Sequence, residues 1–480
     1  MSRDIEEFLR TYTRALEEST AAIFAGAGLS KPAGYVNWKE LLKDIASEIG
    51  LDVDKETDLV EVAQYHVNEN GGNRARINQT LIDEFTKETD ITENHRILAR
   101  LPIKTYWTTN YDKLIEDSLK AAHKRSDNKI TQENLAITMP NSDATIFKMH
   151  GDISHPNDAV LTKDDYESYN NKRSLFTTSL RGDLVSKTFL FIGFSFDDPN
   201  LEYILSRIRV LLGENQRPHY CFMKKVQMGK EYSNKEDFLY AEIKQRLKIN
   251  DLKRFNIKVL LVNEYNEITE ILKVLEDRSK RKNIFISGSA SDYGAWGEKR
   301  TFEFASRLSK KVINSDNNIV TGFGLGIGSC ILSGALEEIY KIKNKRVEER
   351  LISRPFPQHT VGQNSIKELW TIHRRDMIEN VGISIFIFGN KFKNNVIVDA
   401  DGMEEEFAIS LENKSIPIPV GVTGYTAKKL WDLIMNDFAN YVPYPELEID
   451  YKAIGNYQLS DEEVIDHVIN IINKLKKKIV

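Results

Sequence analysis

Short apolar runs alternate with longer amphipathic stretches along most of the chain. The apolar runs have the length of buried strands. The amphipathic stretches repeat apolar residues at intervals of three and four, as a helix with one buried face does. Residues 3–18 are amphipathic in this way, and residues 21–25 are an apolar run that ends in glycine. The pattern therefore predicts a helix followed by a buried strand at the start of the chain.

The same alternation continues to about residue 275. Further strands are expected at residues 105–109, 145–149, 188–192, 219–223 and 258–262. Helices are expected at residues 38–49, 59–67, 77–85, 113–122, 236–248 and from 201 onwards. Repeated strand–loop–helix units predict an α/β fold in which helices cover both faces of a parallel sheet. The helices between the first two strands form a helical insertion near residues 55–100, and a lid and an interface are both open roles for it.

A charged stretch at residues 276–283 interrupts this pattern, and the alternation then resumes. Strands are expected at residues 284–290, 319–321, 350–353, 383–388 and 416–420. Helices are expected at residues 295–312, 365–379, 404–413, 426–437 and 461–477. We therefore expect two Rossmann-like, doubly wound parallel-sheet domains, at residues 1–282 and 283–480.

Composition narrows the class of protein further. The chain has 480 residues, a net charge of −5 and a pI near 6.1, which gives no overall charge footprint for nucleic acid or an anionic membrane. Its apolar runs are too short to span a bilayer, and the acidic N-terminus is unlike a signal peptide. Its two cysteines, Cys221 and Cys330, favour a reducing compartment and exclude a four-cysteine zinc ribbon. We expect a cytoplasmic protein with no nucleic-acid partner, no membrane partner and no metal.

Glycine and polar residues gather at the ends of four predicted strands in the first domain. They are Gly26, Ala27, Gly28 and Ser30, then Asn110 and Asp112, then His150, then Gly193 and Ser195. Ligands of parallel sheets sit at the carboxyl ends of strands, so this joint placement predicts a ligand site. The turn at Gly26 and Gly28 lets backbone N–H groups approach an anion, because neither glycine carries a Cβ. Ser30 is expected to cap the helix that follows.

These residues carry a resemblance. The motifs Gly26-Ala-Gly-Leu-Ser30, Thr109-Asn-Tyr-Asp112, Met149-His-Gly151 and Gly193-Phe-Ser195 resemble those of the sirtuin NAD-binding domain, in the same order. The resemblance covers most of residues 1–280. It implies a Rossmann-like NAD site with the glycine loop on the pyrophosphate and Asp112 near the nicotinamide. The cofactor-binding residues it implies are Ala25, Gly26, Ala27, Gly28, Ser30, Asp112, Gly193 and Ser195.

The chemistry of the residues agrees with an NAD-cleaving site. Asn110 can hydrogen-bond ribose hydroxyls or a water through both donor and acceptor atoms. His150 suits proton transfer near neutral pH. We therefore assign Asn110 and His150 as catalytic. Plainer readings remain beside these: Asn110 as a turn residue, His150 as a structural histidine, and Asp112 as the cap of the next helix.

The departures from the sirtuin pattern change the expected reaction. Sirtuins that deacylate proteins carry a four-cysteine zinc ribbon, which this chain lacks. Water is then the expected acceptor, and NAD would be hydrolysed to nicotinamide and ADP-ribose. Two alternatives stay open. The first is a sirtuin-type protein deacylase or ADP-ribosyltransferase, and the second is a non-catalytic nucleotide sensor.

The second domain resembles the SLOG family of Rossmann-like nucleotide-binding domains. The resemblance lies in Ser287-Gly-Ser-Ala290, the glycine run at 322–328, His373-Arg-Arg-Asp-Met377 and Gly402-Met-Glu-Glu-Glu-Phe407. The SLOG family is related to phosphoribohydrolases, in which the last of these motifs has a double glycine at its start. Residues 399–402 lack this double glycine, which favours ligand sensing over catalysis. The expected signal-binding residues are Gly288, Ser289, Gly324, Gly326, Arg374, Lys391, Glu405 and Glu406. The plainer readings are a solvated helix face for the arginines and an acidic first helix turn for Glu404, Glu405 and Glu406.

A sirtuin-like domain followed by a SLOG domain resembles the NAD-consuming effectors of Thoeris anti-phage systems. This resemblance implies that the second domain binds a cyclic ADP-ribose isomer made by a TIR-domain partner protein. It also implies a homotetramer, allosteric activation by the signal, and antiviral defence through loss of NAD. The linkage isomer of the signal stays open.

Overall fold

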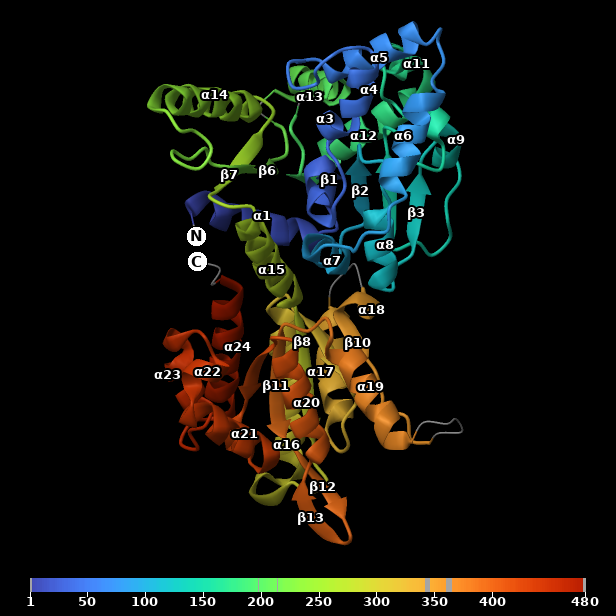
Figure 1. Ribbon diagram of the computed structural model, residues 1–480. Helices are drawn as coiled ribbons and strands as arrows, with labels where there is room; N and C mark the ends of the chain where they lie inside the picture. The colour runs from blue at the N-terminus through green and yellow to red at the C-terminus, as the bar shows by residue number, and fades with distance from the viewer. Residues whose placement is uncertain (1, 197, 214, 342–345, 360–364, 478–480) are drawn as a thin grey trace. The chain divides into compact units, whose positions relative to one another are not determined.

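The structure is a computed structural model that describes residues 2–196, 198–213, 215–341, 346–359 and 365–477. The chain divides into two compact units, Met1–Glu276 and Asp277–Val480. Each unit is built on a parallel sheet flanked by helices (Figure 1). The predicted α/β fold class, with two Rossmann-like domains, is confirmed.

The first unit contains a seven-stranded parallel sheet with the strand order β3-β4-β2-β1-β5-β6-β7. The strands are β1 (Ala21–Ala25), β2 (Thr105–Thr108), β3 (Ser126–Lys129), β4 (Ala144–Lys148), β5 (Thr188–Ile192), β6 (His219–Lys224) and β7 (Ile257–Val262). β1 is paired with β2 on one side and β5 on the other. The chain therefore reverses its direction across the sheet at β1. This is the switch point at which open α/β sheets bind ligands.

Helices cover both faces of this sheet. They are α1 (Arg3–Glu17), α8 (Leu114–Ala121), α12 (Ser174–Ser186), α13 (Pro199–Leu212), α14 (Lys235–Lys253) and α15 (Asn266–Lys280). α1 and α15 pack on one side with Phe8 and Leu272, and α12 and α13 pack on the other with Phe176 and Ile204. Strands β1 and β5 are buried along their whole length, which explains their unbroken apolar sequences.

A helical insertion separates β1 from β2, as the sequence predicts. It contains α3 (Trp38–Leu41), α4 (Lys43–Glu48), α5 (Leu59–Glu69), α6 (Ala75–Phe85) and α7 (Glu93–Arg100). Helices α3 to α6 share a separate apolar core that includes Leu42, Ile45, Ala63 and Leu81, whereas α7 packs into the core of the sheet through Ile97. The single helix expected at 38–49 is wrong, because the chain breaks at Leu42 between α3 and α4.

The second unit contains a five-stranded parallel sheet with the order β10-β9-β8-β11-β14. The strands are β8 (Asn283–Ser289), β9 (Asn318–Thr321), β10 (Leu351–Ser353), β11 (Ile383–Phe388) and β14 (Ile416–Pro419). The main helices are α16 (Gly297–Asn314), α17 (Gly328–Ile339), α19 (Ile366–Ile378), α20 (Asp401–Glu412), α21 (Tyr425–Asn436) and α24 (Asp461–Lys477). β8 is flanked by β9 and β11, so it holds the switch position that β1 holds in the first unit.

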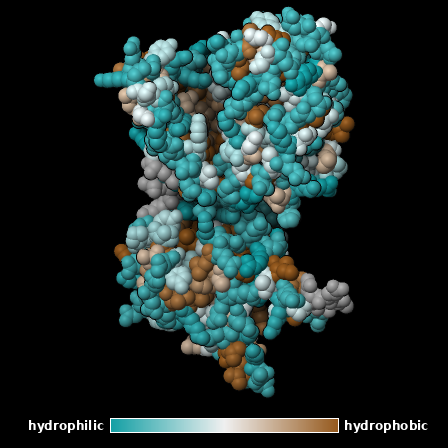
Figure 2. Space-filling view, viewed as in Figure 1, coloured by the Kyte–Doolittle hydropathy of each residue, from teal (hydrophilic) through white to brown (hydrophobic). Residues whose placement is uncertain are grey.

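One short feature of the second unit was not expected. An antiparallel hairpin of β12 (Asn390–Lys393) and β13 (Val396–Asp399) follows β11. Phe392 and Val396 are exposed on it, and Figure 2 shows an apolar group beside its hydrophilic tip. The charged stretch at 276–283 lies where the two units divide, and its residues up to Lys280 belong to the helix α15.

Candidate active site and nucleotide-sensing site

The glycine loop after β1 packs backbone against backbone on the loop after β5. Gly26 N donates to Ile192 O at 3.0 Å, and Gly28 N donates to Gly193 O at 2.9 Å. A Cβ at Gly26 would lie 2.5 Å from Gly193 O, and a Cβ at Gly193 would lie 2.1 Å from Leu29 N. Gly193 also has a φ of +65°, which disfavours a side chain. The glycines are therefore needed to join two loops at the switch point, whatever ligand lies above them.

Asn110 connects the end of β2 to the glycine loop. Its side-chain amide donates to Gly26 O at 3.1 Å and to Ser30 Oγ at 3.0 Å, and the residue is 7% exposed. Ser30 precedes the 3₁₀ turn Lys31–Ala33, but its side chain makes no capping hydrogen bond, so that prediction is wrong. The helix α2 (Ala27–Ser30) already begins at Ala27, and the Ser30 hydroxyl contacts Asn110 instead. With both amide hydrogens used, Oδ1 of Asn110 is the acceptor that remains for a ligand.

The two carboxylate oxygens of Asp112 have different surroundings. Its Oδ1 accepts from Leu114 N, at the first residue of α8, at 3.0 Å, although the cap position itself is held by Lys113. Its Oδ2 is buried and has no hydrogen-bond partner among the described residues. A buried acceptor without a donor is costly, so Oδ2 is suited to a donor group supplied by a ligand or a water.

His150 lies just beyond the end of β4 and is 2% exposed. Its Nε2 lies 3.0 Å from Asp198 Oδ2, and the rings of Tyr166 and Tyr169 meet it edge to face. Burial favours the neutral form of Asp198, but the ion pair with His150 outweighs burial and holds the pKa of Asp198 below its usual value. His150 therefore lies beside a fixed negative charge.

A buried lysine connects the loops that carry Asp112 and His150. Lys148, at the end of β4, is completely buried and donates to the backbone carbonyl of Asp112 and to the carboxylates of Asp152 and Glu116. Burial favours the neutral amine, but the two carboxylates outweigh it and raise the pKa of Lys148. The charged ammonium therefore binds the ends of β2 and β4 together beneath the site.

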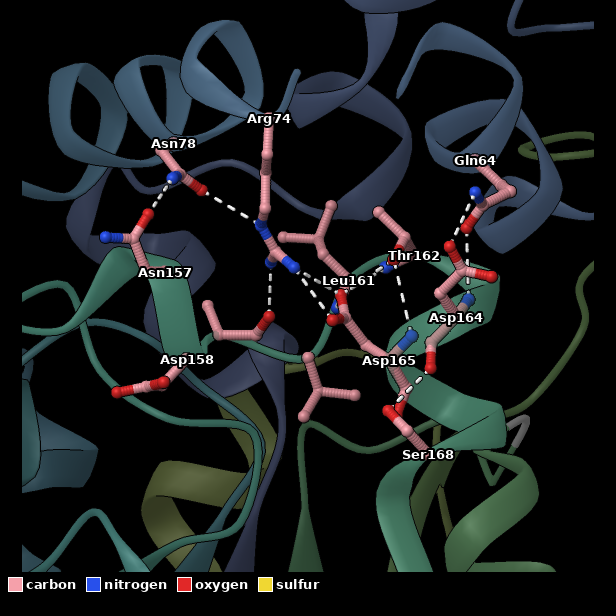
Figure 3. Close-up of polar contacts among 12 residues, drawn as sticks. Gln64, Arg74, Asn78, Asn157, Asp158, Leu161, Thr162, Asp164, Asp165 and Ser168 are labelled. Carbon is pink, nitrogen blue, oxygen red and sulfur yellow. Dashed lines mark hydrogen bonds and ion pairs between the residues drawn. The ribbon is translucent and has the colours of Figure 1, made fainter. Parts of the chain in front are cut away.

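The helical insertion is fastened to the segment that follows His150 (Figure 3). Arg74, which precedes α6, donates to both carboxylate oxygens of Asp165 at 2.7 and 2.8 Å and also to Ala159 O. Gln64 of α5 donates to Asp164 at 3.1 Å, and Asn78 donates to Asn157 at 2.6 Å. We call this set of contacts the clasp.

The clasp borders a cavity whose lining does not include His150. The cavity has a volume of about 300 Å³, and its lining includes Asp165, Tyr169 and Arg173. Tyr169 also donates to Met149 O at 3.1 Å, and Val160 N donates to His150 O at 2.9 Å. The insertion therefore supports the segment whose residue Val160 contacts His150.

The structure thus brings most of the predicted residues of the first domain together. Asn110 contacts Gly26 and Ser30, and Gly28 contacts Gly193, while Ser195 is exposed on its loop. Ala25 and Ala27 flank Gly26, and Ala25 O accepts from Thr108 Oγ1 at 3.0 Å. Sequence reasoning missed Lys148, Tyr166 and Asp198. Of these, Asp198 had a signal, because it follows the same strand-end motif as Gly193.

The second unit repeats the packing of two loops at its own switch point. A Cβ at Gly324 would lie 1.8 Å from Gly288 O, and a Cβ at Gly326 would lie 2.0 Å from Ala290 O. Ala290 N donates to Leu325 O at 2.9 Å, and Ser289 Oγ donates to Asn390 O at 3.2 Å. The loops that follow β8 and β9 are therefore in direct contact through their backbones.

Arg374 lies on α19 and is only 8% exposed, so its reading as part of a solvated helix face is wrong. It donates to Glu405 at 2.7 Å, lies 3.5 Å from Glu406, and places its guanidinium over the Phe356 ring. Burial raises the pKa of Glu406, which accepts from Ser287 at 2.5 Å. Arg374 and these glutamates form one buried polar cluster.

The remaining predicted residues of the second unit lie nearer the surface. Lys391, on β12, is paired with Asp401, and Arg375 is exposed and paired with Glu412 at 2.7 Å. Glu404 is exposed in the first turn of α20, as the plainer reading expects. Among the described residues, no helix is long and apolar enough to cross a membrane, and no group of three or more metal-ligating side chains occurs.

Family models place the chain in a class that joins two kinds of domain. Residues 104–247 match the SIR2-like domain, and residues 267–475 match the Sir2- and TIR-associating SLOG family. The chain is 50% identical to NAD(+) hydrolase ThsA of Bacillus cereus (strain MSX-D12), over 99% of both chains. It is 48% identical to the ThsA of Acinetobacter baumannii (strain 532279) over 96% of both chains, and 46% identical to that of Cytobacillus dafuensis over 99% of this chain and 98% of the relative. The chain belongs to the ThsA family, which confirms the resemblance to the Thoeris effectors.

Proposed function

We propose that the first unit hydrolyses NAD at the bond between nicotinamide and ribose. In this reaction the C1′–N bond breaks, its electron pair leaves with nicotinamide, and the oxygen of water bonds to C1′. One proton is released, and the products are nicotinamide and ADP-ribose. The observation that carries the proposal is the contact of Asn110 with the glycine loop, because it sets a ribose-binding amide beside the pyrophosphate position. The relatives named as NAD(+) hydrolases support the same reaction.

Each buried polar group has a role in this reaction. Oδ1 of Asn110 accepts from a ribose hydroxyl or from the attacking water. The free Oδ2 of Asp112 accepts from the carboxamide of nicotinamide, which orients the leaving group. His150 takes the proton of the attacking water, because an imidazole can accept a proton near neutral pH. The glycine loop from Ala25 to Ser30, with Gly193 and Ser195, lines the pyrophosphate site, but the N–H groups of Gly26 and Gly28 already donate to backbone carbonyls and are not the groups that bind the phosphates.

The second unit senses the signal in this proposal. A cyclic ADP-ribose isomer, supplied by a TIR-domain partner protein, binds across the loops of Gly288, Ser289, Gly324 and Gly326. Lys391 and Arg374 contact its phosphates, and Glu405 or Glu406 accepts from its ribose hydroxyls. The buried cluster around Arg374 supports this role, because a ligand that enters it must exchange partners with a charged group. Because of this exchange, the inactive and active states of the protein differ in their affinity for the signal, as activation requires.

We also propose a homotetramer in the cytoplasm, where loss of NAD halts an infected cell. Exposed apolar side chains on α13 and α14 support self-association. They include Val210, Leu211, Leu239, Tyr240, Ile243 and Leu247. Helix α14 has nineteen residues, and Leu252 is its one described buried residue. Apolar helix faces of this extent on soluble proteins commonly mark an interface.

The experiment that tests the function measures the mass balance of NAD. Purified protein is incubated with NAD and with cyclic ADP-ribose isomers of different linkage, and NAD, nicotinamide and ADP-ribose are quantified by chromatography. We expect equal amounts of nicotinamide and free ADP-ribose, none from His150→Ala or Asn110→Ala, and retained signal binding by both variants. Acyl-ADP-ribose or modified protein would favour the transferase alternative. NAD that is bound but left intact under every condition would favour the sensor.

Two variants test the sensing site. Arg374→Ala should abolish activation, but it also leaves the buried Glu406 without its cation. Lys391→Ala removes a less buried cation, whose partner Asp401 is exposed, and should raise the signal concentration needed for half-activation without disturbing the fold. Activation of both variants at the wild-type signal concentration would contradict the assignment of this site.

A further inference from the structure

Asp198 has two separate attachments, one for each carboxylate oxygen. Oδ1 accepts from Leu201 N at 3.0 Å and so caps the first turn of α13. Oδ2 faces the site, where it lies 3.0 Å from Nε2 of His150 and accepts from the Tyr166 hydroxyl at 3.3 Å. The carboxylate is 8% exposed and the imidazole 2%. The helix cap therefore fixes the plane of a carboxylate whose other oxygen is presented to His150.

The loop that carries Asp198 is fixed at its other end as well. Gly193 is locked against the glycine loop by the backbone contacts described above. Phe194 and Phe196 pack on Phe191 and on each other, with ring centroids 5.0 to 6.3 Å apart. Phe196 is held at a φ of +63°, where non-glycine residues are uncommon. This loop thus connects the pyrophosphate cradle to the carboxylate beside His150.

We propose that Asp198 is a positioning residue for NAD hydrolysis, which holds the His150 ring with Nε2 toward the carboxylate and leaves Nδ1 to take the proton of the attacking water. This rests on the proposed function, in which His150 is the base. When water attacks C1′, its proton passes to Nδ1 and His150 becomes an imidazolium. The negative charge of Asp198 stabilises that cation at 3.0 Å, and the proton then leaves to solvent.

The surroundings of His150 make Asp198 the partner that sets its orientation. Both ring nitrogens are buried and neither has an aligned hydrogen bond within the described part of the chain, and Tyr166 and Tyr169 offer the ring only edges and faces. A negative charge therefore governs which nitrogen is protonated. The lowered pKa of Asp198 keeps this carboxylate ionised at neutral pH. The Tyr166 hydroxyl limits its rotation without neutralising it.

The competing explanation is that Asp198 is only a helix cap. Asparagine caps helices about as well as aspartate does, and it has nearly the same shape. Asp198→Asn therefore keeps the bond to Leu201 N and removes the negative charge beside His150. A matched control exists in Asp58, which caps α5 through bonds to Val60 N and Glu61 N at 3.0 and 3.1 Å, with no contact to the site. Asp58→Asn makes the same chemical change at a cap without a histidine.

The experiment compares wild type, Asp198→Asn and Asp58→Asn as full-length proteins. For each, kcat and KM for NAD are measured at saturating activator, and the thermal midpoint is recorded. Because general base catalysis contributes about 10²- to 10⁴-fold, we expect Asp198→Asn to lower kcat by about 10²-fold. KM and the thermal midpoint should stay close to wild type, and Asp58→Asn should match wild type in all three.

Three outcomes would overturn the proposal. The first is a kcat of Asp198→Asn within twofold of wild type. The second is a rise in its kcat, which would mean that Asp198 restrains His150 instead of orienting it. The third is a fall in kcat with an equal rise in KM and a lower thermal midpoint, which would mean a structural role. A wild-type protein that hydrolyses no NAD would refute the proposed function itself, so the two failures differ.

Discussion

The contact between the two loops of the first unit can be tested by adding one methyl group at Gly193. In Gly193→Ala the new Cβ lies 2.1 Å from Leu29 N and 2.6 Å from the carbonyl carbon of Gly28. Both neighbours are backbone atoms, so no side-chain rotation can relieve the overlap. Gly50→Ala is the matched control, because Gly50 has a similar φ of +78° and nothing lies within 4 Å of its Cβ position.

The two variants separate two costs. A positive φ costs an alanine about 1–2 kcal/mol, and the reduced freedom of the unfolded chain returns about 0.4–1 kcal/mol. Gly50→Ala should therefore lose about 1 kcal/mol of folding free energy. Gly193→Ala has the same terms and must also displace one loop, at about 1–3 kcal/mol or more by comparison with overpacked cores. We expect a difference between the variants of about 2 kcal/mol, or roughly 3–4 °C in the midpoint of a unit that spans Met1–Glu276.

The assay is calorimetry of the full-length proteins, combined with hydrogen exchange of peptides that cover residues 20–30 and 188–196. The chain has two units, so midpoints are compared for the transition in which those peptides lose protection. Gly193→Ala should lower that transition more than Gly50→Ala and should speed exchange in both loops. Equal midpoints for the two variants, with unchanged exchange, would refute the reasoning.

Three further predictions each concern a single side chain or a single ion pair. Burial lowers the pKa of His219 to about 3, so its contribution to stability is complete above the unfolded pKa of about 6.5 and falls by about 1.4 kcal/mol per pH unit as the pH drops toward 3. His219→Asn keeps an acceptor for the backbone donor at Phe189, and urea unfolding of the variant should lack that slope. Arg74→Ala breaks the partly buried pair with Asp165 and should cost about 1–3 kcal/mol by urea unfolding, whereas Arg76→Ala, in an exposed pair, should cost under about 1 kcal/mol. Leu239→Asp on the exposed face of α14 should lower the mass measured by sedimentation, and an unchanged mass would exclude that face from the interface.

The sequence pattern predicted buried strands better than exposed ones. The strand expected at 188–192 is β5 with the same bounds, because a strand buried on both faces is apolar throughout. The edge strand β3 was missed, because its residues are polar and Asp127 and Lys129 satisfy each other in an ion pair at 2.9 Å. The hairpin β12–β13 was also missed, although Asn394 and Asn395 both have positive φ, as in the turns that join hairpin strands.

The candidate site could be predicted only where it follows a strand end. Asn110, Asp112 and His150 lie at carboxyl ends of parallel strands, so sheet topology alone brought them to the edge of the sheet at which the glycine loop also lies. Asp198 has the local sequence of an ordinary helix cap before proline, and its contact with His150 joins residues far apart in sequence. The clasp depends in the same way on the packing of the insertion, which a periodic pattern does not describe.

The glycines of both units have a common explanation that does not depend on phosphate. In the first unit Gly26 and Gly28 admit the backbone at Gly193, and in the second Gly324 and Gly326 admit the backbone from Gly288 to Ala290. Each contact fixes two strand ends at a switch point, which is where a nucleotide would bind. Because these backbone contacts exist without a ligand, ligand binding does not have to spend free energy on ordering the loops. The backbone contact and the nucleotide site are therefore compatible. A glycine variant with lower stability would not by itself show that the glycine touches NAD.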